Sequence, residues 1–120
     1  MIENFRRFEA GPDPSGRTWR VELLWLQNAI AIRRADAVDV KFRLTCGGET
    51  EEKVVGMMHP DLLRLAAKLG RRLTDPWCLK LAALHLRHAI ESGEAGAGAL
   101  ITPSFEELER HAGAAAVASR

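Results

Sequence analysis

Hydrophobic and polar residues alternate along much of the first half of the chain, the period of two that is typical of a half-buried β-strand. The alternation is most regular over residues 38–46. A second alternating segment places four apolar residues in one register: Trp19, Val21, Leu23 and Trp25. Shorter candidate strands occupy residues 5–9, 29–32 and 51–58, and turns are expected at Gln27-Asn28 and Gly47-Gly48. These segments predict a four- to five-stranded antiparallel meander sheet.

From Pro60 onward the apolar residues recur with a helical period of 3.6. Proline suits the first turn of a helix and glycine the residue after its end, so residues 60–69 and 76–92 are predicted to be helices. A Gly/Ala-rich stretch over residues 94–100 follows. A third, acidic helix is expected to begin near Thr102-Pro103, and its end at residues 112–116 is expected to fray.

Strands followed by helices indicate an α+β fold, with one face of the sheet covered by two or three C-terminal helices. We expect residues 1–93 to form a single domain. Residues 94–120 are expected to be a linker plus the acidic helix, packed on the domain or on a partner subunit. No internal repeat is present.

Composition narrows the class of protein. The 120 residues are 47% hydrophobic and 28% charged, with a net charge of +1, which fits one globular domain and excludes a strongly basic nucleic-acid coat. No apolar run has the length of a secretory signal or of a membrane-spanning helix. Two cysteines do not make a disulfide framework, and Arg strongly outnumbers Lys. We therefore expect a protein of the bacterial cytoplasm that makes no membrane contact.

The predicted helix over residues 76–92 is apolar on most sides, and its charged residues occupy only a narrow wedge. Such a helix lies beneath other elements or against a second copy of itself. The leading hypothesis is therefore a non-enzymatic interaction module that forms a homodimer. The interface residues expected on this helix are Trp77, Leu81, Leu84 and His88.

Charge is unevenly distributed along the chain. Residues 60–90 carry six Lys or Arg against two acidic residues, whereas residues 91–120 carry five Glu against two Arg. We expect the basic and acidic segments to dock within or between subunits. An alternative hypothesis is a nucleic-acid-associated regulator, in which the anion contacts would be Arg64, Lys68, Arg71 and Arg72. The near-neutral total and the apolar second helix argue against it.

A second alternative is a small enzyme or metal-binding protein. His85 and His88 are three residues apart and could share a metal ion with carboxylates from elsewhere. Cys78 could not join His85, because seven helical residues separate them by about 10.5 Å. His59, beside Asp61 at a helix start, is a weak candidate for acid–base work. No nucleotide-binding or hydrolase motif is present, and no cofactor is expected.

Overall fold

The computed structural model describes residues 4–29, 37–96 and 98–118 and confirms the α+β class. A five-stranded sheet in the order β1-β2-β3-β4-β5 is combined with three helices. The strands are β1 (Arg7–Ala10), β2 (Trp19–Ala29), β3 (Ala37–Cys46), β4 (Glu49–Met58) and β5 (Leu100–Ile101). The helices are α1 (His59–Leu69), α2 (Asp75–Ser92) and α3 (Phe105–Ala118).

Strands β1 to β4 form the predicted antiparallel meander, but β5 pairs with β4 in parallel. The fifth strand is thus formed at the end of the expected linker, whose last residue is Leu100. The chain reaches it by crossing over through α1 and α2, and the Val54 amide donates to the Ala99 carbonyl. A two-residue strand is too short to show a periodicity, so the sequence gives no sign of this pairing.

Strand β2 runs through Gln27 and Asn28, where a turn was expected. A bulge between Leu23 and Trp25 shifts its register against β3. The bulge adds one residue to β2, and one extra residue reverses which face of the sheet the following side chains lie on. Trp25 therefore pairs with Lys41 and not with a residue whose side chain faces the core. The Lys41 ammonium lies 5.8 Å from the centre of the Trp25 ring, on the face of the sheet away from the core. The expected inward position of Trp25 is therefore wrong, and residues 30–32 lie outside the described part of the chain.

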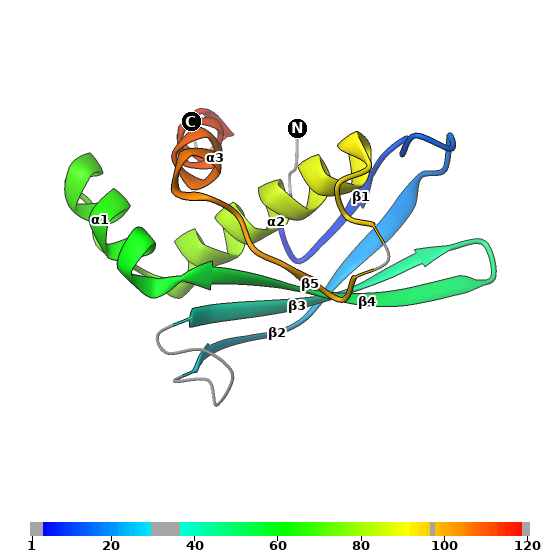
Figure 1. The fold of residues 1–120 in the computed structure, drawn as a ribbon, viewed down its shortest axis with the longest axis horizontal. Coiled ribbons are helices and arrows are strands. Elements are labelled where there is room, and N and C mark those ends of the chain that lie inside the picture. The colour runs from blue at the N-terminus through cyan, green and yellow to red at the C-terminus, as the bar shows by residue number, and fades with distance from the viewer. Residues whose placement is uncertain (1–3, 30–36, 97, 119–120) are drawn as a thin grey trace.

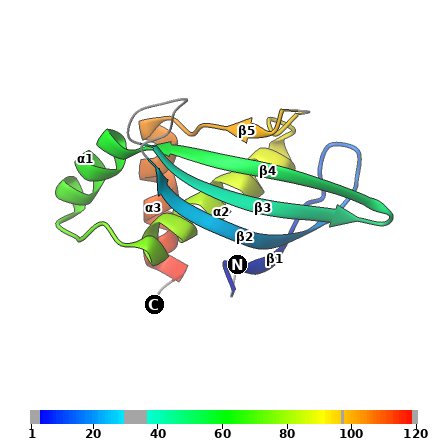
Figure 2. The same ribbon diagram turned by 90° about the horizontal axis from the view of Figure 1, so that it is seen from below.

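The molecule has three layers (Figure 1). Helix α2 crosses one face of the sheet, α1 continues from the end of β4, and α3 packs on α2 and α1. Figure 2 shows the opposite face of the sheet without a covering helix. The core between the layers is formed by alternate residues of the strands and one side of each helix, including Val40, Phe42, Leu62, Leu86 and Leu108.

The helix boundaries follow local signals. The Thr74 hydroxyl accepts a hydrogen bond from the Trp77 amide at the start of α2, and Gly70 and Gly93 end α1 and α2 in the left-handed conformation. Helix α3 does not fray where expected, because Ala112 and Ala115 are buried. Within residues 4–29, 37–96 and 98–118, no helix combines the length and apolarity needed to cross a membrane.

Candidate metal centre

Three of the four histidines of the chain meet between α2 and α3. His85 and His88 lie on α2, and His111 comes from α3. The ring centres are 5.2 Å apart for His85 and His111, 6.0 Å for His88 and His111, and 6.3 Å for His85 and His88. His85 and His88, whose spacing would let them share a metal ion, therefore lie close to each other.

The position of His111 depends on the packing of α3. Leu108 and Ala112 are buried in the core, and His111 lies between them in sequence at the interface with α2. Glu107 is one helical turn earlier, so Glu107 and His111 lie on the same side of α3. Two helices therefore present two pairs of ligating side chains to each other.

His85 and His111 form a buried hydrogen bond. His85 Nδ1 lies 3.0 Å from His111 Nε2, and the two residues are 3% and 6% exposed. Burial lowers the pKa of His85. Burial, together with the neighbouring His85, lowers the pKa of His111 to about 4. Both imidazoles are therefore neutral at pH 7, which is the form that binds metal ions.

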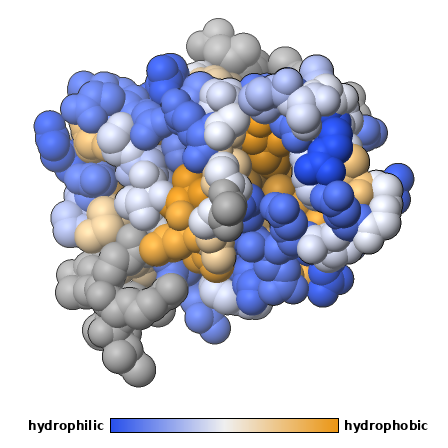
Figure 3. Space-filling model, turned by 45° about the vertical axis from the view of Figure 1, so that its right-hand side comes forward, coloured by the Kyte–Doolittle hydropathy of each residue, from blue (hydrophilic) through white to orange (hydrophobic). Residues whose placement is uncertain are grey.

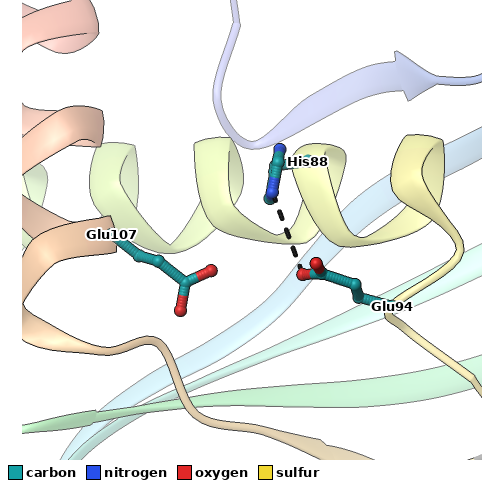
Figure 4. A group of neighbouring side chains, drawn as sticks. All are labelled: His88, Glu94 and Glu107. Carbon is teal, nitrogen blue, oxygen red and sulfur yellow. Dashed lines mark ion pairs between the residues drawn. The ribbon is translucent and has the colours of Figure 1, made fainter.

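Two carboxylates, those of Glu94 and Glu107, lie beside the three histidines (Figure 4). These five residues are called the cluster below. His88 Nε2 lies 3.8 Å from Glu94 Oε2, and His85 Nδ1 lies 4.0 Å from Glu107 Oε2. Donor atoms of His88, Glu94 and Glu107 all lie within 4.8 Å of one another. Figure 4 shows the three side chains approaching from α2, from the segment after α2, and from α3.

Glu107 is held in place by a capping box at the start of α3. The Ser104 hydroxyl accepts from the Glu107 amide, and Glu107 Oε1 accepts from the Ser104 amide. The hydrogen bond from the Ser104 backbone is the main reason why the pKa of Glu107 is lowered. Glu107 is consequently ionised, with Oε1 used by the cap and Oε2 directed toward His85.

Two cavities border the cluster. One, of about 270 Å³, is lined by His85, Ala89, Glu94, Ala95, Leu100, Ile101, Thr102 and Glu107. The other, of about 230 Å³, is lined by Leu84, Arg87, His88, Glu91, Arg110, His111 and Ala114. Both carboxylates of the cluster line the first cavity, whereas His88 and His111 line the second.

A further cavity of about 310 Å³ lies beside the turn after α2 and is separate from the histidines. Figure 3, turned toward this side of the molecule, shows an apolar area framed by hydrophilic residues. The basic side chains that line this cavity, Arg17 and Lys53, already have partners. Buried Lys53 donates to the Gly96 and Gly98 carbonyls, and Arg17 donates to Glu49.

The remaining candidate residues lie away from the cluster. His59 is the half-buried first residue of α1 and lines neither of the two cavities beside the histidines. The Cys78 thiol is buried, and burial raises its pKa to about 11, so a nucleophilic role is not supported.

The predicted anion contacts and interface residues are partly used within the chain. Lys68 forms an ion pair with Glu109, and Arg64 and Arg71 stack on Phe105 and Trp77. Basic α1 and acidic α3 are thus in contact within one subunit. Trp77 and Leu81 are buried in the monomer core, whereas Leu84 and His88 are partly exposed.

Three members of the cluster were not predicted: Glu94, Glu107 and His111. The capping box Ser104-Phe105-Glu106-Glu107 and the spacing of four between Glu107 and His111 are visible in the sequence. Together they could have indicated a helix with two ligands on one face. Glu94 carries no such signal, because it lies in a Gly/Ala-rich turn.

Comparisons with family models, with curated proteins and with solved structures found no match for this chain.

Proposed function

We propose that the protein binds a divalent transition-metal ion through His88, Glu94 and Glu107. The observation that carries this proposal is the convergence of one imidazole and two carboxylates, from three separate segments, to within 4.8 Å. The neighbouring pair His85 and His111 supplies two further neutral imidazoles next to these ligands.

The residues fit such an ion. Donor atoms bound to a tetrahedral zinc ion at about 2.0–2.2 Å lie about 3.3–3.6 Å from one another, so donor atoms that now lie within 4.8 Å must approach by up to about 1.5 Å. The Glu94 side chain is 62% exposed and can make that movement without disturbing the core. Glu107 and His88 are fixed on helices, which supplies the rigid part of the site.

The donor set favours a metal of intermediate hardness. Imidazole nitrogen suits zinc, copper, iron and nickel, whereas carboxylate oxygen extends the range to manganese. A set of three protein ligands is characteristic of zinc sites that keep one coordination position open. In such sites the zinc ion acts as a Lewis acid and lowers the pKa of a coordinated water molecule. Zn²⁺ is therefore the first ion to test.

Calorimetric titration of the full chain with Zn²⁺ tests this proposal. We expect one ion per chain, and we expect His88→Ala and Glu107→Gln each to weaken binding by more than the roughly 10–100-fold typical of lost outer-shell contacts. His59→Ala is the matched control, because it removes the one histidine outside the cluster. Equal affinity for the native chain and both ligand variants would refute the site.

A second candidate function is the predicted homodimeric interaction module. Leu63 and Leu69 of α1 are each 49% exposed, although most large apolar residues of the described chain are buried. Their exposure favours α1 as a contact surface. Light scattering at micromolar concentration should give the mass of a dimer for the native chain and of a monomer for Leu63→Lys. A native mass of 13.3 kDa would end this candidate.

A further inference from the structure

The cavity of about 310 Å³ beside the turn after α2 has a buried lysine in its wall. Lys53 is 3% exposed and pairs across the sheet with Phe42, a fully buried core residue. Residues directly opposite each other in an antiparallel pair lie on the same face, so Lys53 lies on the face that the helices cover. Lysine is rarely buried unless its charge is paired. The apolar register of β4, occupied by Val55 and Met57 further along, is thus interrupted by a charge at the cavity.

The ammonium group of Lys53 has three N–H donors but only two hydrogen bonds within the described residues. Its Nζ atom lies 3.0 Å from the Gly96 carbonyl oxygen and 2.7 Å from that of Gly98. Glu51 Oε2 is 3.8 Å away, which is beyond hydrogen-bonding distance, and the Glu51 side chain is 46% exposed. The third donor is therefore available to a molecule in the cavity.

Most of the surface that lines this cavity is apolar, and Pro14, Trp19 and Ile90 are among the wall residues. Figure 3 shows apolar surface between hydrophilic residues on this side of the molecule. The loop that contains Pro14 touches the turn after α2, because a Cβ atom at Gly93 would lie 2.8 Å from Pro14 Cγ. An apolar group that entered the cavity would gain from burial against this wall.

The charged side chains of the wall balance one another, with Arg17 and Lys53 opposed by Asp13 and Glu51. An anionic ligand would add a charge beside two carboxylates, and a cationic ligand would approach the buried ammonium of Lys53. A neutral ligand would add no charge to the wall. The cavity therefore favours uncharged molecules.

We infer that this cavity binds small uncharged molecules that combine an acceptor oxygen, such as a carbonyl or hydroxyl group, with an apolar body. The oxygen accepts the third hydrogen bond of Lys53, and the apolar body lies against Trp19 and Ile90. Hydrogen bonds from a charged donor are stronger than those between neutral groups, so the acceptor oxygen is required for tight binding. The site uses none of the histidines and is independent of the proposed metal centre.

The test uses the full chain with a chelator present, so that metal binding does not enter the measurement. Benzamide is the probe, benzoate carries a negative charge on the same ring, and acetamide has the same acceptor without the ring. We expect benzamide to bind at least about tenfold more tightly than either. In ¹H–¹⁵N spectra the indole N–H signal of Trp19 should shift. The signals of Trp25, on the uncovered face of the sheet, and of Trp77, at the other end of α2, should not.

Two pairs of variants locate the ligand. Lys53→Met keeps a long side chain but removes the donors, and it should weaken benzamide binding by about 10–100-fold. Lys68→Met, which changes an exposed lysine of α1, should leave the affinity unchanged. Ala95→Leu adds volume to the cavity wall and should abolish benzamide binding, whereas Ala114→Leu, away from this cavity, should not. Because Ala95→Leu retains Lys53, it tests the site even if Lys53→Met does not fold.

The outcomes separate this inference from the proposed function. A chain that binds benzamide but not Zn²⁺ would refute only the metal centre. No benzamide binding up to about 10 mM, or benzoate bound as tightly as benzamide, would overturn the ligand class. Signal shifts at Trp25 or Trp77 in place of Trp19, or full benzamide affinity in Lys53→Met or Ala95→Leu, would overturn the assignment to this cavity.

Discussion

His85 Nδ1 and His111 Nε2 lie 3.0 Å apart and join α2 to α3 through a hydrogen bond between two buried imidazoles. The bond fixes the orientation of both rings beside Glu107 and His88. It also satisfies two polar groups that would otherwise be costly in the interior. The same contact therefore contributes to the stability of the helix layer and to the geometry of the proposed metal site.

Replacing His111 by Ala should lower the free energy of unfolding by about 1–3 kcal/mol, because His85 is left buried without its partner. Urea unfolding in the presence of a chelator measures the change. His88→Ala, on the same helix but 39% exposed at its side chain, is the control and should cost about 0.5 kcal/mol or less under these conditions. Equal losses in the two variants would contradict the role of the buried pair.

Two helix caps should have similar effects on stability but different effects on metal binding. Ser104→Ala and Thr74→Ala each remove a side-chain cap and should each destabilise the protein by about 1 kcal/mol. Only Ser104→Ala should also weaken Zn²⁺ binding, because Ser104 positions Glu107. Chemical unfolding and calorimetry measure the two quantities, and a loss of zinc affinity in Thr74→Ala would argue against this explanation.

Zinc should raise the stability of the folded chain. An ion that binds only the folded state adds about 2.7 kcal/mol when its free concentration is 100 times its dissociation constant. Thermal unfolding with Zn²⁺ and with a chelator should therefore differ for the native chain. The difference should shrink strongly in Glu107→Gln, and an undiminished difference would place the ion elsewhere.

Asp13 makes one part of the stability depend on pH. Its carboxylate accepts from the Arg17 and Ser15 amides and from Trp19 Nε1, and these hydrogen bonds hold its pKa well below its usual range. A lowered pKa in the folded state stabilises the protein above the unfolded value of about 3.9 and loses this contribution as the pH falls. The stability difference between the native chain and Asp13→Asn should thus be largest near neutral pH and narrow below about pH 4. Urea titrations at several pH values measure it, and a constant difference would contradict the assignment.

Cys78 should be unreactive in the folded protein. Its thiol is 2% exposed, and burial raises its pKa to about 11, so almost no thiolate is present at pH 8. Alkylation with iodoacetamide followed by mass spectrometry should modify Cys46, which is partly exposed, before Cys78. Rapid modification of Cys78 under native conditions would show that α2 opens readily.

Much of the fold could be predicted from local patterns. The alternation over residues 38–46 corresponds to β3, and the Pro and Gly signals place both ends of the two predicted helices within one residue of those of α1 and α2. Trp25 escaped this reasoning because a bulge reverses an alternation without leaving a residue signature. Strand β5 escaped it because its pairing with β4 depends on a crossover that local periodicity does not encode.

Local periodicity and capping residues are enough to predict the α+β class, the order of β1 to β4 and of the three helices, and the helix on which His85 and His88 lie three residues apart. The approach of His111, Glu94 and Glu107 to these histidines depends on tertiary packing. These residues are 6 to 26 positions away from the two histidines of α2 along the chain, and His111 and Glu107 reach them because Leu108 and Ala112 bury one side of α3 against the other helices. The packing of apolar side chains thus brings the polar ligands together.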